Sequence, residues 1–176
     1  LLIFAATVPP RKPLGHGAGL RFSRNDLKLV LENRPALGYI LGYGAHCWEL
    51  FGYRSWLVAF LVYSLSLQPG FASPLSPQNV ATLILLIGVP ASILGNEGAM
   101  AWGRRKALTV YMIGSGLLGC VIGFAAGLNF YLVVALALLY GMTVLFDSGA
   151  LTAGLVAETP EGQRGITLAV YSFSGF

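Results

Sequence analysis

The stretch NFYLVVALALLYGMTVLFDSGALTAGLVA, at positions 129–157, decides the fold class. It carries one charged side chain, Asp147, and it exceeds the roughly 20 apolar residues that a helix needs to cross a bilayer. Its apolar residues are continuous, whereas a transmembrane β-strand alternates apolar and polar residues over about 10 positions. We therefore expect a membrane-spanning α-helix here, and an all-α, polytopic membrane protein as a whole.

The composition of the whole chain supports a membrane protein. Hydrophobic residues make up 56% of it and charged residues 10%, whereas soluble domains have about 25% charged residues. Its 23 glycines lie inside the apolar stretches as well as between them, which suits closely packed helices in a bilayer. The lipid bilayer is thus the first partner that the sequence predicts.

Further apolar stretches divide the chain into spans. We expect four complete spans and, at each end of the chain, part of another, with a polar linker at 9–33. The spans form a C-terminal transmembrane bundle over 34–176, and 1–8 ends a preceding helix. The complete spans are 35–67, 79–101, 107–126 and 129–157, and the truncated one is 164–176.

The linker and the third span carry two further patterns. Residues 24–32 predict a short amphipathic helix along the membrane surface. The linker's cations also suit a lipid or nucleic-acid contact, but a solvated linker explains them better, and we expect no nucleic-acid partner. Asn33 is the predicted N-cap of the first complete span. In the third span Gly119, Gly123 and Gly127 predict a close-packing ridge on a peripheral helix.

The positions of the basic residues predict the topology. If the linker 9–33 is cytoplasmic, the loop 102–106 is cytoplasmic too, and the loops 68–78 and 127–128 lie outside without any cation. This is the bias of the positive-inside rule, so we expect a multi-pass protein of the cell inner (plasma) membrane. Ten of the eleven cations then lie inside: Arg11, Lys12, Arg21, Arg24, Lys28, Arg34, Arg104, Arg105, Lys106 and Arg164.

Polar side chains on the spans predict a functional cavity. A charge at bilayer depth costs about 2.5–3.5 kcal/mol, so each one needs a reason. Helical steps of about 100° place five polar residues of the first span within one arc, with Arg54 at its border. The fourth and fifth spans carry comparable faces. We expect these faces to line a water-filled cavity, made by Tyr39, Tyr43, His46, Glu49, Tyr53, Arg54, Tyr140, Thr143, Asp147, Thr167 and Tyr171.

Two structural alternatives remain open for these charges. Glu49 could form a permanent pair with Arg54 or His46 that only holds helices together, and Asp147 could anchor packing near the inner loops. In the functional case Glu49 binds and releases a proton, with His46 one turn away as a relay.

The inner loop LGNEGAMAWGRRKAL, at 94–108, resembles a motif of the major facilitator superfamily, G-x-x-x-D-R-x-G-R-R. Met100 stands at the position of its Asp, and Glu97 offers a carboxylate one turn earlier. The stretches 42–56 and 139–176 resemble the seventh, tenth and eleventh helices of a bacterial subgroup of that superfamily. The residues that we assign to the motif, which serves conformational cycling, are Gly95, Glu97, Gly103, Arg104 and Arg105.

The resemblance implies the C-terminal six-helix bundle of a transporter, cut within its sixth and eleventh helices. It implies a secondary transporter of a small-molecule solute that works by alternating access, with protons as one coupling ion to expect. Its partner would be the missing N-terminal half of the same chain. The alternative is an integral-membrane subunit, or a membrane-embedded enzyme, whose intramembrane polar residues are structural.

Enzyme motifs are not found in the sequence. It contains no GxSxG, no HExxH and no P-loop, and its two cysteines form no metal-binding pattern with histidine. We expect neither catalysis, nor a cofactor, nor a metal.

Overall fold

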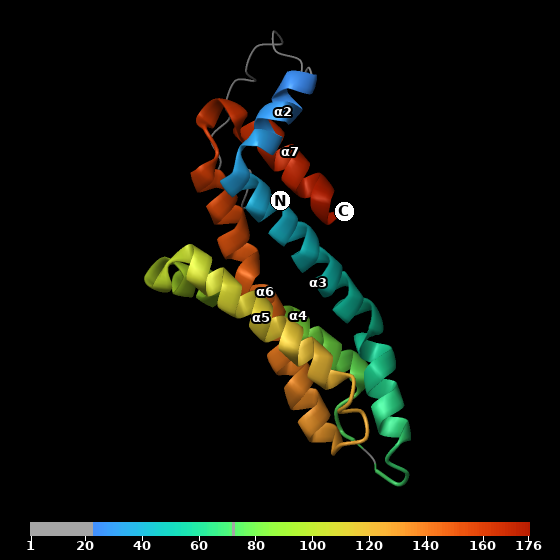
Figure 1. Cartoon of the computed structure of the whole chain (residues 1–176). Helices are drawn as coiled ribbons and strands as arrows, with labels where there is room; N and C mark the ends of the chain where they lie inside the picture. Colours follow the sequence, from blue (N-terminus) through green and yellow to red (C-terminus); the bar gives the residue numbers. More distant parts are fainter. Residues whose placement is uncertain (1–22, 72) are drawn as a thin grey trace, which may run out of the picture.

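The computed structural model describes residues 23–71 and 73–176, and within them every regular element is a helix (Figure 1). The all-α class is therefore confirmed for the described part. The predicted helix end at 1–8 and the linker up to residue 22 lie outside the described residues. The elements are α2 (Arg24–Glu32), α3 (Arg34–Ser66), α4 (Pro77–Trp102), α5 (Arg104–Ile122), α6 (Phe130–Glu158), the 3₁₀ helix η1 (Glu161–Gln163) and α7 (Arg164–Gly175).

Polar caps explain where three of these helices begin. The Asn33 side chain accepts a hydrogen bond of 3.2 Å from the Ala36 amide, so its predicted role as N-cap of α3 is confirmed. Ser76 accepts from the Asn79 amide at the start of α4 in the same way. The Asn129 side chain accepts from the Tyr131 amide at 3.0 Å and starts α6.

The end of α5 differs from the sequence-based expectation. The helix stops at Ile122, four residues before the predicted span does, and a series of turns leads to α6. Beyond this end, the Ala126 carbonyl accepts a hydrogen bond from the Ser64 hydroxyl at 2.8 Å, in place of one from a helical backbone amide. The predicted glycine ridge is wrong at Gly123 and Gly127, which have open space where a Cβ would stand. Gly119 does lie close, against the Tyr140 hydroxyl.

Helix α6 is the centre of the bundle and contacts α3, α4, α5 and α7 (Figure 1). Of the 18 most apolar consecutive residues of α6, 50% are buried, against 28% for α4 and 22% for α5. Glycines allow the close approach: Gly95 of α4 lies against the backbone of Phe146, and Gly154 of α6 lies beneath the Tyr39 ring. Because α6 has buried residues along its whole length, side chains of the four helices that contact it meet around it.

The amphipathic helix predicted at 24–32 is found with these bounds as α2. Val30 is buried, and it joins Ala36, Ile40, Leu155 and Tyr171 in an apolar cluster that connects α2, α3, α6 and α7. The described part of the linker is therefore packed on the bundle rather than solvated throughout. Its location along a membrane surface stays a prediction.

Three helices of the described part, α4, α5 and α6, are long and apolar enough to cross a membrane. This supports a membrane protein. The remaining predicted complete span, 35–67, corresponds to α3, which has 33 residues and carries His46, Glu49 and Arg54. Because these polar residues lower its hydropathy, the crossing of α3 stays a prediction.

Segments predicted on the same side of the membrane lie together. Arg34, Arg105 and Glu158, at the ends of three different helices, line one cavity. The two predicted outer loops meet elsewhere: the Gln68 side-chain amide donates to the Leu128 carbonyl at 2.8 Å, and its oxygen accepts from the Phe130 amide at 3.3 Å. Which of these two regions faces the cytoplasm stays a prediction.

Single-cysteine labelling tests the topology. We expect Ser73→Cys to react with a membrane-impermeant maleimide in intact cells, because the positive-inside rule places the loop 68–78 outside. Cys47 and Cys120 are free cysteines, so both are first replaced by serine. The matched control, Lys106→Cys, should react only after permeabilisation. The reverse pattern of labelling would invert the topology.

Candidate functional site

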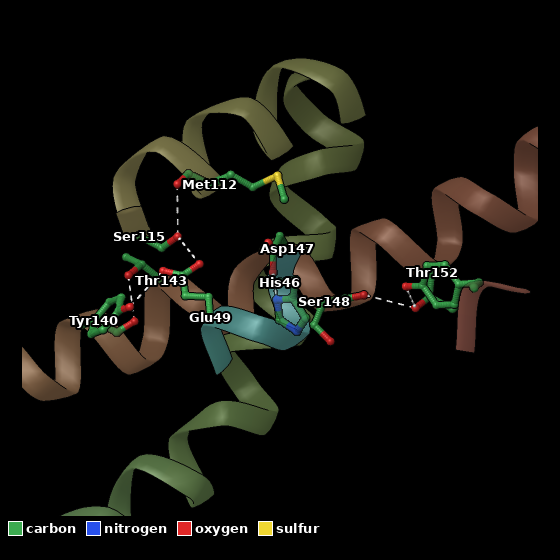
Figure 2. Close-up of polar contacts among 10 residues, drawn as sticks. His46, Glu49, Met112, Ser115, Tyr140, Thr143, Asp147, Ser148 and Thr152 are labelled. Carbon is green, nitrogen blue, oxygen red and sulfur yellow. Dashed lines mark hydrogen bonds and ion pairs between the residues drawn. The ribbon is translucent and has the colours of Figure 1, made fainter. Parts of the chain in front are cut away.

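Glu49 of α3 is held by hydroxyl groups of two other helices. One carboxylate oxygen accepts from the Tyr140 hydroxyl of α6 at 3.1 Å, and the other accepts from the Ser115 hydroxyl of α5 at 3.1 Å (Figure 2). The Glu49 side chain is half-buried. Hydrogen bonds to both oxygens offset part of the cost of removing a carboxylate from water. Glu49 is thus a positioned carboxylate shared by three helices.

Next to it, His46 of α3 faces Asp147 of α6 (Figure 2). The imidazole Nδ1 lies 2.7 Å from a carboxylate oxygen of Asp147, and the two side chains are 2% and 3% exposed. Removing either partner of a buried pair leaves a polar group without its counterpart, so the two side chains are stable only together. The described residues therefore contain a buried histidine–carboxylate pair where α3 contacts α6.

Aromatic side chains extend the site towards α7. The Tyr43 ring stacks on the Tyr171 ring with centroids 3.9 Å apart, and it lies 6.0 Å from the His46 ring. The Tyr171 hydroxyl is 2.9 Å from the hydroxyl of Thr152. Thr167, one turn before Tyr171, is buried. The faces predicted on the first, fourth and fifth spans thus meet in the fold.

Tyr53 closes the opposite end of this row of polar residues. Its hydroxyl donates to the Ala137 carbonyl at 2.6 Å, and its ring meets the edge of the Tyr140 ring at 4.7 Å. Beyond it, an apolar cluster that includes Leu57, Leu61 and Phe130 fills the space between α3, α4 and α6. The polar residues therefore lie between two apolar clusters.

Three predicted residues lie apart from these contacts. Arg54 is exposed and lines a separate cavity of about 370 Å³ beside α4. Tyr39 is half-buried over Gly154, and the Thr143 hydroxyl donates to the Tyr140 carbonyl of its own helix at 2.9 Å. The partners of Glu49 are hydroxyl groups, and the partner of His46 is Asp147, so neither alternative pair proposed for Glu49 is the contact found.

The residues of the loop motif have different surroundings. Gly95 is buried against Phe146, while Glu97 and Arg105 are exposed. Gly103 joins α4 to α5 with a φ of 87°, a left-handed conformation that favours glycine. The Arg104 side chain passes close to Gly154 of α6. Gly95 therefore serves helix packing, and Gly103 allows the sharp connection.

Sequence reasoning missed two residues of the site, Ser115 and Thr152. Ser115 is buried on a helix expected to be a peripheral scaffold, yet it donates to Glu49. A serine in an apolar helix also satisfies its hydroxyl on its own backbone, as Ser115 does with Met112 at 3.2 Å. No signal in the sequence therefore distinguished it from a packing residue.

Comparison of the chain with protein-family models, with curated proteins and with solved structures gives no match. Membership of the major facilitator superfamily stays a prediction.

Proposed function

We propose that the chain is the C-terminal half of a secondary transporter of the major facilitator type, which moves a small solute across the inner membrane by alternating access. The observation that carries the proposal is the meeting of Glu49, Tyr140 and Ser115 beside the His46–Asp147 pair, inside a bundle with three helices apolar enough to span a membrane. Charges at such depth are costly, and in membrane proteins they mark substrate and ion pathways.

In this proposal the solute binds against α3 and α6, and Glu49 binds and releases a coupling proton. The hydroxyl groups of Tyr140 and Ser115 hold the carboxylate, and rocking of this bundle against an opposing one would change the side of the membrane that the carboxylate faces. The His46–Asp147 pair serves as the relay. Arg104 and Arg105 are the first two residues of α5, on the cytoplasmic side of the proposed topology, and act in cycling.

Replacing Glu49 with glutamine tests the coupling role. Glutamine keeps the shape and one oxygen acceptor for Tyr140 or Ser115 but cannot release a proton, so we expect uphill uptake to be abolished and solute exchange to persist. The measurement uses the complete reading frame in membrane vesicles with a pH-sensitive dye and a panel of sugars, amino acids, carboxylates and organic cations.

Glu32→Gln is the matched control, because Glu32 is exposed on α2, outside the predicted cavity and the loop motif, and should leave uptake unchanged. Uptake against a gradient at the wild-type level in the Glu49→Gln protein would contradict the coupling role. The transporter proposal is wrong if two results come together. The wild-type protein moves no solute of the panel, and the second candidate function described next passes its test.

A second candidate function is an integral-membrane subunit or a membrane-embedded enzyme whose polar groups fix the helix packing. The observation that favours it is the burial of the His46–Asp147 pair, since a transport path needs groups that water or solute reaches. Single and double variants of His46 and Asp147 separate the two candidates, because both their stability and their transport can be measured.

A further inference from the structure

A cavity lies between α3, α5 and α6, apart from Glu49 and its hydrogen-bond partners. Its volume is about 530 Å³, which is within the range of sites for small molecules. Charged residues stand at helix ends on its rim: Arg34 is the first residue of α3, Arg105 the second of α5, and Glu158 the last of α6. We call it the helix-end cavity.

Its deeper walls are apolar. Leu108 and Met112 of α5 and Leu151 of α6 line it one or more turns from the charged rim. Glycines of α3 keep it open: Gly38 has no atom within 4 Å of where its Cβ would stand, and Gly42 meets only Leu151 and Met112. The helix-end cavity is therefore charged at one end and apolar at the other, which is the pattern of an amphiphile.

Within the part of the chain that the structure describes, none of the three charged side chains forms an ion pair. Among residues 23–71 and 73–176, the ion pairs within 4.0 Å are Lys28–Glu32, His46–Asp147 and Arg164–Glu161, so neither rim guanidinium is paired with Glu158. The charges of Arg34, Arg105 and Glu158 are two positive and one negative. A ligand that matches them carries an anionic group for the arginines and a cationic donor for the carboxylate.

We propose that the helix-end cavity binds a phospholipid with a primary ammonium in its headgroup, of the phosphatidylethanolamine class. The phosphate lies between the guanidinium groups of Arg34 and Arg105, the ammonium donates to Glu158, and the acyl region follows Leu108 and Met112. Helix ends lie at headgroup depth, so a lipid reaches this position without leaving its leaflet. The proposal does not depend on transport.

Two related headgroups fit less well. A trimethylammonium, as in phosphatidylcholine, has no N–H to donate to Glu158. Phosphatidylglycerol offers hydroxyl donors but no cation, so the charge of Glu158 would not be balanced beside the phosphate. The carboxylate therefore sets the preference for the ammonium, and the arginines set the affinity for phosphate.

Native mass spectrometry of the purified chain in detergent tests this. Phosphatidylethanolamine, phosphatidylcholine and phosphatidylglycerol with identical acyl chains are offered in equal amounts. We expect the first to be retained about tenfold better than the other two, as the loss of one charge-assisted hydrogen bond implies. Equal retention of all three lipids would overturn the proposal.

Variants separate the roles of the two kinds of charge. Arg105→Gln should weaken phosphatidylethanolamine and phosphatidylglycerol alike by about tenfold. Glu158→Gln should abolish the preference between those two lipids. It retains the fold, because Asn33 is bound to the backbone carbonyl of Glu158 and not to its side chain. Lys106→Gln, at the next position of α5 but outside the cavity lining, is the control and should change nothing.

Soluble glycerophosphoethanolamine distinguishes a lipid from a free phosphate compound. It lacks the acyl chains, so we expect it not to displace the bound lipid at millimolar concentration. Displacement at that concentration would mean that the apolar walls contribute nothing, and the lipid assignment would be wrong. A Glu158→Gln protein that still prefers phosphatidylethanolamine would also contradict it.

Discussion

Replacing Gly95 with alanine is expected to destabilise the bundle by about 3 kcal/mol, because the new Cβ would overlap the backbone of Phe146. A flexible side chain moves aside for an added methyl group, but a carbonyl inside a helix cannot. The axes of α4 and α6 would have to separate along their shared contact. The measurement is the thermal unfolding of the purified protein in detergent, followed by size-exclusion chromatography after heating.

Gly38→Ala is the matched control for that substitution. Gly38 is also a helical glycine, on α3, but no atom lies within 4 Å of the added Cβ. We expect it to be neutral or stabilising by up to about 1 kcal/mol, since alanine favours a helix over glycine. If Gly95→Ala unfolds at the same temperature as Gly38→Ala, the close approach of α4 to α6 is not part of the fold.

This pair of variants also separates two roles of Gly95. The resemblance assigns it to a loop motif that acts in conformational cycling, whereas its buried contact with Phe146 assigns it to packing. A packing residue lowers the unfolding temperature in detergent, where no cycling is measured. A residue that acts only in cycling leaves that temperature unchanged.

The helices could be predicted from the sequence more closely than their contacts. The start of α3 after its N-cap Asn33 and the bounds of α2 could be predicted from apolar length and polar caps, because these signals act within a few residues of the chain. The end of α5 was missed, since Ser64, far away in sequence, binds the Ala126 carbonyl there.

The candidate site shows the same division between local and distant information. Helical periodicity placed His46 and Glu49 on one face of α3, and Tyr140 and Asp147 on one face of α6. Their pairing depends on the axial position of one helix against the other. His46 meets Asp147, and Glu49 meets Tyr140, so α3 and α6 run antiparallel. Nothing within either helix specifies that alignment.

The spacing of the two contacts also describes the crossing. His46 and Glu49 are about 4.5 Å apart along the axis of α3, while Tyr140 and Asp147 are about 10.5 Å apart along α6. Side chains of different length and an oblique crossing make up the difference. A helical wheel contains neither of these quantities. It therefore could not show that the partners of Glu49 lie on α5 and α6 and not on its own helix.

The second large effect is expected at the buried pair. His46→Leu or Asp147→Leu alone should cost about 3–5 kcal/mol of stability, because each leaves one buried polar group without its partner 2.7 Å away. The double variant His46→Leu/Asp147→Leu removes both groups and should regain most of that loss, as buried pairs replaced by apolar residues do. Thermal unfolding of the four proteins in detergent gives the coupling between the two positions. Strictly additive losses would show that the pair does not hold α3 to α6.

The folded double variant then decides between the two candidate functions. If the pair relays a proton, solute-dependent proton movement in vesicles should disappear while the protein remains as stable as the wild type. If the pair only fixes the packing, leucine replaces it in that role, and the activity of the complete protein should be unchanged. Single variants cannot make this distinction, since each of them lowers stability in either case. The double variant separates them because it removes the His46–Asp147 pair without leaving an unpaired charge in the bundle.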